Sequence, residues 1–211
     1  MESARTNILA RLKAAQEKRG EIEELIPDFT SPIYPPINQS LDIEFKTNLE
    51  LIGGEVIICK SQLEVAENIL RICAEKQQNR IFCSNPELNK LLSGSIEINS
   101  AENDFLDINI GLTGCEFLIA QLGSVLISSA QLSGRRLNVF PETHLVVAHQ
   151  SQLTDYLDQA LEKLQIKYKN KLPSLISNIT GPSRTADIEK TLVMGMHGPK
   201  SLIVLISEES I

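Results

Sequence analysis

The sequence predicts an α/β fold, in which a largely parallel sheet is flanked by helices and an antiparallel hairpin region lies near the middle of the chain. From Leu41 onward, short apolar strands alternate with amphipathic segments of helical length, which is the pattern of βαβ units. Near the centre, two apolar strands flank the turn Gln121-Leu122-Gly123 closely enough to pair as antiparallel neighbours. The length of 211 residues suits one substantial domain with a small appendage.

The first forty residues predict a helix followed by a proline-rich arm. Residues 3–19 place Ile8, Leu9 and Leu12 on one helical face, and Gly20 follows as a stop. Four prolines between positions 27 and 36 exclude a regular helix there. Such an arm lies on its own domain or clasps a partner subunit in a homo-oligomer, and the sequence leaves both open. We divide the chain into residues 1–40, the helix and arm, and residues 41–211, a single α/β domain.

Helices and strands then alternate up to position 92. A helix from Leu41 ends at the glycine pair 53–54, and the strand 56–59 follows. Ser61 with Glu64 forms a capping box at the start of the next helix, and the strand 81–83 comes after it. A short helix through residue 92 begins at Asn85-Pro86, which supplies a cap and a first-turn proline.

The second half of the chain is richer in strands. Alternation of apolar and polar residues over 106–110 predicts a strand with one wet face. The hairpin strands are 115–120 and 124–128, and further strands are expected at 144–148, 175–179 and 202–206. A helix over 151–169 carries one apolar stripe, made of Leu153, Leu157, Leu161, Leu164 and Tyr168.

Composition and charge exclude several functional classes. The hydrophobic content of 42% fits a folded domain, and the net charge of −7 with a pI near 5.1 disfavours a nucleic-acid or anionic membrane surface. No apolar run reaches membrane-spanning length, because the longest one, 115–127, is interrupted by Glu116, Gln121 and Gly123. The N-terminus lacks a signal-peptide core, so we expect a soluble cytoplasmic protein.

The cysteines do not predict a metal or a cofactor. Cys59, Cys73, Cys83 and Cys115 are widely spaced and form no C-x-x-C pair, whereas zinc and iron–sulfur sites use clustered thiolates. We expect these thiols to be buried and reduced. No metal ligand set and no cofactor follows from the sequence.

The strongest candidate site is the loop Thr180-Gly181-Pro182-Ser183-Arg184, with Thr185 and Asp187 behind it. An apolar strand enters the Gly-Pro turn, and a helix is expected directly after it. Free amides and the positive end of that helix would receive a carboxylate or phosphate, with Arg184 as a bidentate clamp. The junction would lie at the carboxyl end of a strand, where open α/β sheets bind ligands. Alternatively, Ser183 or Thr185 only caps the helix, and Asp187 satisfies its end.

Two further positions are candidates beside that loop. His197, in a turn before the last strand, would approach the Thr180 loop across the helix and act as acid or base, or it only holds its turn. The turn at Gln121 and Gly123 would present Gln121 and the Ser124 hydroxyl to a ligand, or Gly123 only supplies a positive φ. His144 and His149 are expected to be structural. Together these residues do not make a complete catalytic set.

Several of these segments resemble one known family. The stretches 179–189 and 195–199 are similar to the C-terminal signature of the LUD domain family, specifically the lactate utilisation protein C group (LutC/YkgG). Residues 111–124 and 141–147 resemble its central blocks, so the resemblance covers roughly 41–206. One departure is Gln121, where the family usually has a carboxylate, so an acid–base role at this position is not expected.

The resemblance implies a NagB/RpiA/CoA-transferase-like fold and a role in the oxidation of L-lactate to pyruvate. It implies iron–sulfur protein subunits as partners, with this chain as the cluster-free accessory member that binds a small carboxylate or a partner protein. The resemblance transfers no catalytic residue. Two other functions stay open, a stand-alone enzyme on a phosphorylated or CoA-linked metabolite and a pure protein-interaction module.

Overall fold

The computed structural model describes residues 4–17, 30–32, 34–99, 109–186 and 192–210. The chain divides into two compact units, Met1–Pro36 and Ile37–Ile211. The first contains α1 (Ala4–Glu17), which buries none of its side chains. The predicted helix is therefore confirmed over 4–17. The predictions that concern Gly20 and Pro27 fall outside the described residues.

A six-stranded sheet forms the centre of the second unit, and every pairing within it is parallel. Residues on successive positions of a strand face opposite sides. Leu145 and Val147 accordingly join one apolar cluster, while Val146 and Ala148 join another. In spatial order the strands are β1 (Glu55–Cys59), β12 (Ser201–Ser207), β7 (Thr143–His149), β4 (Ile110–Thr113), β2 (Arg80–Cys83) and β3 (Glu97–Asn99).

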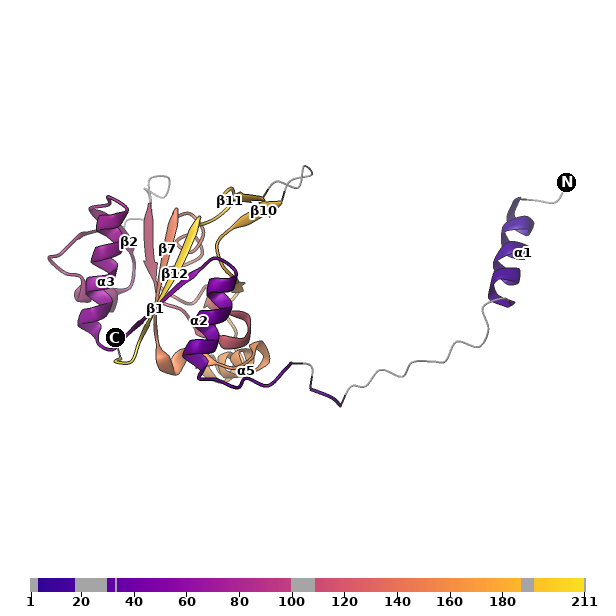
Figure 1. Cartoon of the computed structure of the whole chain (residues 1–211), viewed down its shortest axis with the longest axis horizontal. Coiled ribbons are helices and arrows are strands. Elements are labelled where there is room, and N and C mark those ends of the chain that lie inside the picture. The colour runs from indigo at the N-terminus through magenta and orange to yellow at the C-terminus, as the bar shows by residue number, and fades with distance from the viewer. Residues whose placement is uncertain (1–3, 18–29, 33, 100–108, 187–191, 211) are drawn as a thin grey trace. The chain divides into compact units, whose positions relative to one another are not determined.

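Helices cover both faces of this sheet (Figure 1). On one face lie α3 (Gln62–Glu75) and α4 (Pro86–Leu91), each begun by its predicted cap, because Ser61 Oγ accepts from the Glu64 amide and Asn85 Oδ1 accepts from the Glu87 amide. The other face packs against α2 (Leu41–Leu51) and a second sheet. The predicted α/β class, a largely parallel sheet flanked by helices, is confirmed.

The second sheet has four strands, in the order β8-β5-β6-β9. The predicted hairpin is confirmed, because β5 and β6 pair antiparallel across the 3-10 turn Ala120–Leu122. Helix α5 (Leu157–Lys167) covers its outer face, where Ala160 and Leu164 pack against Ile119 and Leu126. The strands are β8 (Leu153–Thr154), β5 (Phe117–Ile119), β6 (Ser124–Ser128) and β9 (Ile176–Ile179).

The predicted helix over 151–169 needs correction. The helix expected from residue 151 begins only at Leu157, because Leu153 and Thr154 pair with β5 as a short parallel strand and leave the helical path. Leu161, expected on the buried stripe, is 38% exposed. Most of the strand expected over 106–110 lies outside the described residues, and β4 begins at Ile110.

Candidate functional site

The Thr180 loop leads into a strand and not into the predicted helix. Residues Arg184–Ala186 form β10, which pairs antiparallel with β11 (Leu192–Met194). The helix N-terminus that was expected to bind an anion is therefore absent at 184–186, since these residues are held by cross-strand partners. Asp187, the last predicted site residue, lies outside the described residues. The preceding strand, β9, belongs to the four-stranded sheet, so the loop does not follow a strand of the parallel sheet.

The protein's own backbone engages part of this loop. The Ser183 amide donates to the Pro199 carbonyl at 2.8 Å, and the Ser183 carbonyl accepts from the Gly195 amide at 2.9 Å. A Cβ placed on Gly198 would lie 3.0 Å from the Cβ of Ser183, so the two loops touch. The turn that carries the exposed His197 therefore lies directly beside Ser183, without an intervening helix at this point.

Arg184 lies at the C-terminal end of α2. A Cβ placed on Gly53 would come within 2.9 Å of Arg184 Nη2, the far end of a flexible side chain, so it is the φ of +84° that favours glycine there. Gly53 and Gly54 close the helix by donating to the carbonyls of Glu50 and Leu49. A cation at the carbonyl end of a helix stabilises it, which gives Arg184 a structural role whether or not it also binds a ligand.

The Gln121 turn packs against the same helix. Asn48 Nδ2 donates to the carbonyls of Ala120 and Gln121 at 2.9 and 3.2 Å. Gly123 has the predicted positive φ, +57°, and a Cβ there would overlap the backbone of α2. Ser124 is fully buried, and its hydroxyl has no partner among the described residues.

The structure brings the separately predicted segments together. Antiparallel pairing of β6 with β9 ends at Val125 and Ile179, so the next residues along the two strands are Ser124 and Thr180. A Cβ on Gly181 would lie 3.2 Å from the Ile52 carbonyl oxygen, which places this loop on α2 as well. We call this arrangement the α2 loop cluster; it consists of residues 121–124, 180–184 and 195–199.

A second polar cluster was not predicted from the sequence. Glu116, with a fully buried side chain, accepts from Ser128 Oγ and Tyr168 Oη at 2.6 and 2.7 Å through Oε1. Its Oε2 accepts from Lys167 Nζ at 2.6 Å. We call these four residues the Glu116 cluster.

The Glu116 cluster keeps its carboxylate ionised. Burial alone would raise the pKa of Glu116, but the hydrogen bonds from Lys167, Ser128 and Tyr168 outweigh it, and the pKa is lowered below its ordinary value. For Lys167, burial acts to lower the pKa, but the bond to Glu116 raises it. The ammonium is therefore protonated and is not a nucleophile at neutral pH.

The remaining histidines hold structure, as expected. His144 is fully buried between strands and shares a hydrogen bond of 2.8 Å between Nε2 and Thr113 Oγ1. Burial lowers the pKa of His144 to about 4, so its ring is neutral. His149 accepts from the Ser151 amide and lies 3.2 Å from the Glu208 carbonyl oxygen, which fixes the turn after β7.

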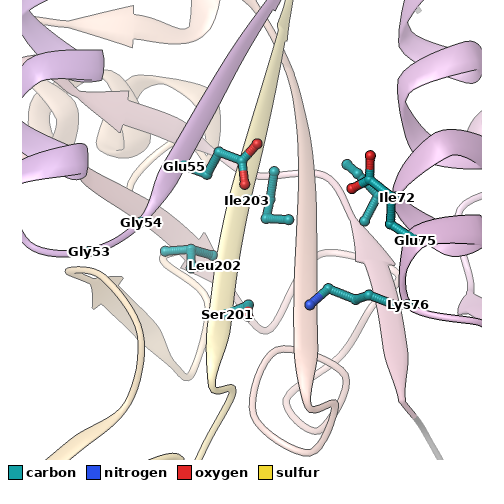
Figure 2. Close-up of a pocket in the computed structure, with 9 residues that line it drawn as sticks. All are labelled: Gly53, Gly54, Glu55, Ile72, Glu75, Lys76, Ser201, Leu202 and Ile203. Carbon is teal, nitrogen blue, oxygen red and sulfur yellow. The ribbon is translucent and has the colours of Figure 1, made fainter.

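A pocket of about 370 Å³ lies at the amino edge of the parallel sheet, next to Gly53 (Figure 2). Glu55 extends from β1, while Glu75 and Lys76 come from the end of α3 (Figure 2). None of the predicted site residues lines it. Ligands of open α/β sheets bind at the opposite, carboxyl edge, so this pocket is a weaker candidate.

The cysteines are buried and free, as predicted. Burial raises the pKa of Cys59, Cys73 and Cys83 to about 11 and raises that of Cys115 further. Within the described ranges, no group of three or more His, Cys, Asp or Glu side chains is arranged to hold a metal ion. Likewise, the described helices all lack the length and apolar content that a bilayer crossing requires.

Sequence comparison matches the chain to known proteins. The family model of the LUD domain matches residues 43–207. YkgG of Escherichia coli K12 is 29% identical over 187 residues, which are 79% of this chain and 78% of that protein. Lactate utilization protein C of Bacillus subtilis 168 is 36% identical over 103 residues, 47% of this chain and 43% of that protein. Lactate utilization protein C of Geobacillus kaustophilus HTA426 is 31% identical over 163 residues, which are 74% of this chain and 64% of that protein.

The matched segment thus spans less than two thirds of either lactate utilization protein C. A crystal structure of a DUF162 family protein from Deinococcus radiodurans superimposes with a TM-score of 0.62 at 16% identity. The superposition covers 82% of this chain and 99% of that one, so the two chains share a fold.

Proposed function

Since the chain belongs to the LUD domain family, we propose that it acts in lactate utilization, as an accessory subunit that carries no iron–sulfur cluster of its own. The names of its relatives in Bacillus subtilis and Geobacillus kaustophilus support the role in lactate utilization. The observation that carries the proposal further is the α2 loop cluster, because three segments similar to the family signature converge there from distant parts of the chain.

The state of the thiols supports a role without a cluster. Iron–sulfur clusters bind thiolates, and a thiol whose pKa is raised to about 11 is protonated at neutral pH. The four cysteines are also buried in the core. We therefore assign the electron-carrying clusters of the lactate-oxidising system to partner proteins.

The α2 loop cluster is our proposed contact site for a small carboxylate or for a partner. Arg184 and His197 are exposed there, and each offers N–H donors to an acidic group. The engaged Ser183 amide does not contribute to such a site, so binding depends on side chains more than on free backbone amides.

Reconstituted lactate oxidation tests this function. The iron–sulfur proteins of the native host would be assayed for L-lactate-dependent pyruvate formation with and without this chain. We expect at least a tenfold loss without it and a similar loss with Arg184→Ala. The matched control is Arg71→Ala, which removes an exposed arginine paired with Glu75 on α3 and should stay within twofold of wild type.

Two results would overturn the proposal or its site. Unchanged oxidation in the absence of the chain would refute the role in lactate utilization. Equal activity and equal carboxylate affinity of Arg184→Ala and wild type would remove the α2 loop cluster as the contact site. Arg71→Ala should melt close to wild type, because it removes only an exposed side chain. Arg184→Ala should cost no more than about 1 kcal/mol, the size of its interaction with the carbonyl end of α2.

A further inference from the structure

The order of the parallel strands creates a topological switch point between β2 and β4. These strands are neighbours in the sheet, but the chain leaves them in opposite directions. After β2 it passes through α4 to β3 on one side, and the strand of this sheet that follows β4 is β7, on the other side. In open α/β sheets, the crevice outside the carboxyl ends of two such strands is where ligands bind.

A cavity of about 220 Å³ opens at this position. Asn85 follows β2, and Thr113 and Gly114 lie at the end of β4. The Glu116 cluster forms another wall through Glu116, Lys167 and Tyr168, and the remaining lining residues are Leu112 and 130–133. With roughly 30 Å³ for each water in the liquid, the cavity holds the volume of about seven waters, which suits a molecule of about six non-hydrogen atoms.

The lining of the cavity offers donors in excess of acceptors. Asn85 Oδ1 accepts from the amides of α4, and Gln131 Oε1 accepts from the Ser128 amide. Their side-chain nitrogens have no partner among the described residues, so both NH₂ groups remain available. The buried Ser133 hydroxyl also lacks a partner in the described structure. A buried polar atom without a partner costs free energy unless a ligand or water satisfies it.

Charge narrows the class of ligand. Glu116 neutralises Lys167 in a direct ion pair, and the carboxylate already has three donors, so the cavity has no surplus positive charge for a dianion. A cation gains little there, because the only carboxylate in the lining is already paired with the Lys167 ammonium. Lys167 uses one ammonium proton on Glu116 and half of its side chain is exposed, so its other N–H groups can donate to a ligand. A monoanion is favoured over a dianion, because less negative charge is brought beside the neutral ion pair.

We infer that this cavity binds a small monocarboxylate that carries a hydroxyl or keto oxygen on the adjacent carbon. Lys167 Nζ and the Gln131 amide would hold the carboxylate, and the Ser133 hydroxyl and the Asn85 amide would hold the second oxygen. The choice of a 2-hydroxy or 2-oxo acid, such as lactate or pyruvate, rests on the proposed function in lactate utilization. The cavity itself is separate from the α2 loop cluster, since the two lie near opposite ends of β6. With the acid bound in the cavity, the α2 loop cluster is the contact site for a partner, the second of the two roles proposed for it.

Direct titration of the full chain tests the inference without partner proteins. L-lactate, pyruvate, acetate and inorganic phosphate would each be added at millimolar concentration and followed by amide chemical shifts and calorimetry. We expect saturable binding of lactate or pyruvate, at least tenfold tighter than acetate and phosphate. Lys167→Gln should weaken it at least tenfold, and Ser133→Ala about threefold to tenfold.

The matched control is Lys163→Gln, one helical turn before Lys167, where the ammonium lies 5.9 Å from the Phe117 ring centroid and does not line the cavity. It should bind the acids within twofold of wild type. Lys167→Gln leaves the buried Glu116 carboxylate without its ion pair and can impair folding. Ser133→Ala removes only an unpartnered hydroxyl, so it tests the cavity even if Lys167→Gln does not fold.

Three outcomes would overturn the inference. They are no binding by folded wild-type protein, binding that neither Lys167→Gln nor Ser133→Ala weakens, and tighter binding of phosphate than of the acids. Each leaves the role in lactate oxidation to be judged by the reconstituted assay, because that assay does not depend on where the acid binds.

Discussion

His144 is buried in the sheet as a neutral imidazole, which makes stability depend on pH. Burial lowers its pKa from 6.5 to about 4 in the folded protein. Above pH 6.5 the ring is neutral in both states and stability is complete. Between pH 6.5 and 4 the unfolded chain binds a proton that the folded protein does not, so stability falls as the pH falls. We expect a loss of about 3 kcal/mol at pH 4, measured by urea unfolding across this range.

His144→Gln is the control for that loss, because its amide keeps a hydrogen-bonding group near Thr113 but does not titrate. The variant should be less stable at pH 7 and should lose most of the pH dependence between 6.5 and 4.5. Glu116 contributes at lower pH, since its pKa is held below 4.5 and its contribution is lost as the pH falls through that lowered value. If the unfolding free energy of His144→Gln depended on pH as steeply as that of wild type, the pH dependence would come from another group.

Single residues also show what local sequence does not reveal. Glu116 stands in an apolar run, where sequence reasoning treats it only as an interruption. Its partners Ser128, Lys167 and Tyr168 lie 12, 51 and 52 positions away, so no spacing rule links them. The only available signal was a charged residue at the start of the first hairpin strand, which must be paired if it is buried.

At the scale of elements, apolar strands bounded by turn residues were predictable and short polar strands were not. The hairpin of β5 and β6 follows from two apolar runs around a glycine turn. By contrast, β10 has the sequence Arg-Thr-Ala after a serine, which locally resembles a capped helix start. Its strand conformation comes from pairing with β11, just as β8 forms through pairing with β5. Tertiary partners overrode local preference in both places.

Gly123 joins two elements, and its replacement should damage both. Alanine would have to adopt a φ of +57°, and its Cβ would overlap the backbone of Asn48 and Leu49 in α2. Left-handed strain and steric overlap together should lower the free energy of unfolding by about 3 kcal/mol. Gly134→Ala is the matched control, because Gly134 has a φ of +60° but open space around it, and about 1 kcal/mol is expected. Equal losses in chemical unfolding would show that contact with α2 is unimportant.

At the scale of the whole molecule, the sequence identified segments but not their arrangement. It placed candidate residues in the turn at 121–124, the loop at 180–184 and the turn at 195–199. The fold packs the first two against α2 and the third against Ser183 of the second. It did not reveal the cavity at the switch point, because that cavity depends on β2 and β4 being neighbours although β3 lies between them in the chain. Strand order of this kind is a property of the complete sheet.

Because the chain divides into two compact units at Pro36, we predict that residues 37–211 fold without the segment that precedes them. In the described structure α1 buries no side chain, whereas Ile37 and Leu41 pack against the core around Phe45 and Leu49. Removal of residues 1–36 should therefore leave the thermal midpoint and the amide spectrum of the domain unchanged. Phe45→Ala, which empties a fully buried site, should cost about 3–5 kcal/mol in the same assay. A fall of more than about 4 °C on truncation would mean that the segment stabilises the domain by about 1 kcal/mol or more. If truncation also lowered the molecular mass in solution by more than the mass of the deleted residues, the segment would stabilise the domain by holding a second copy of the chain.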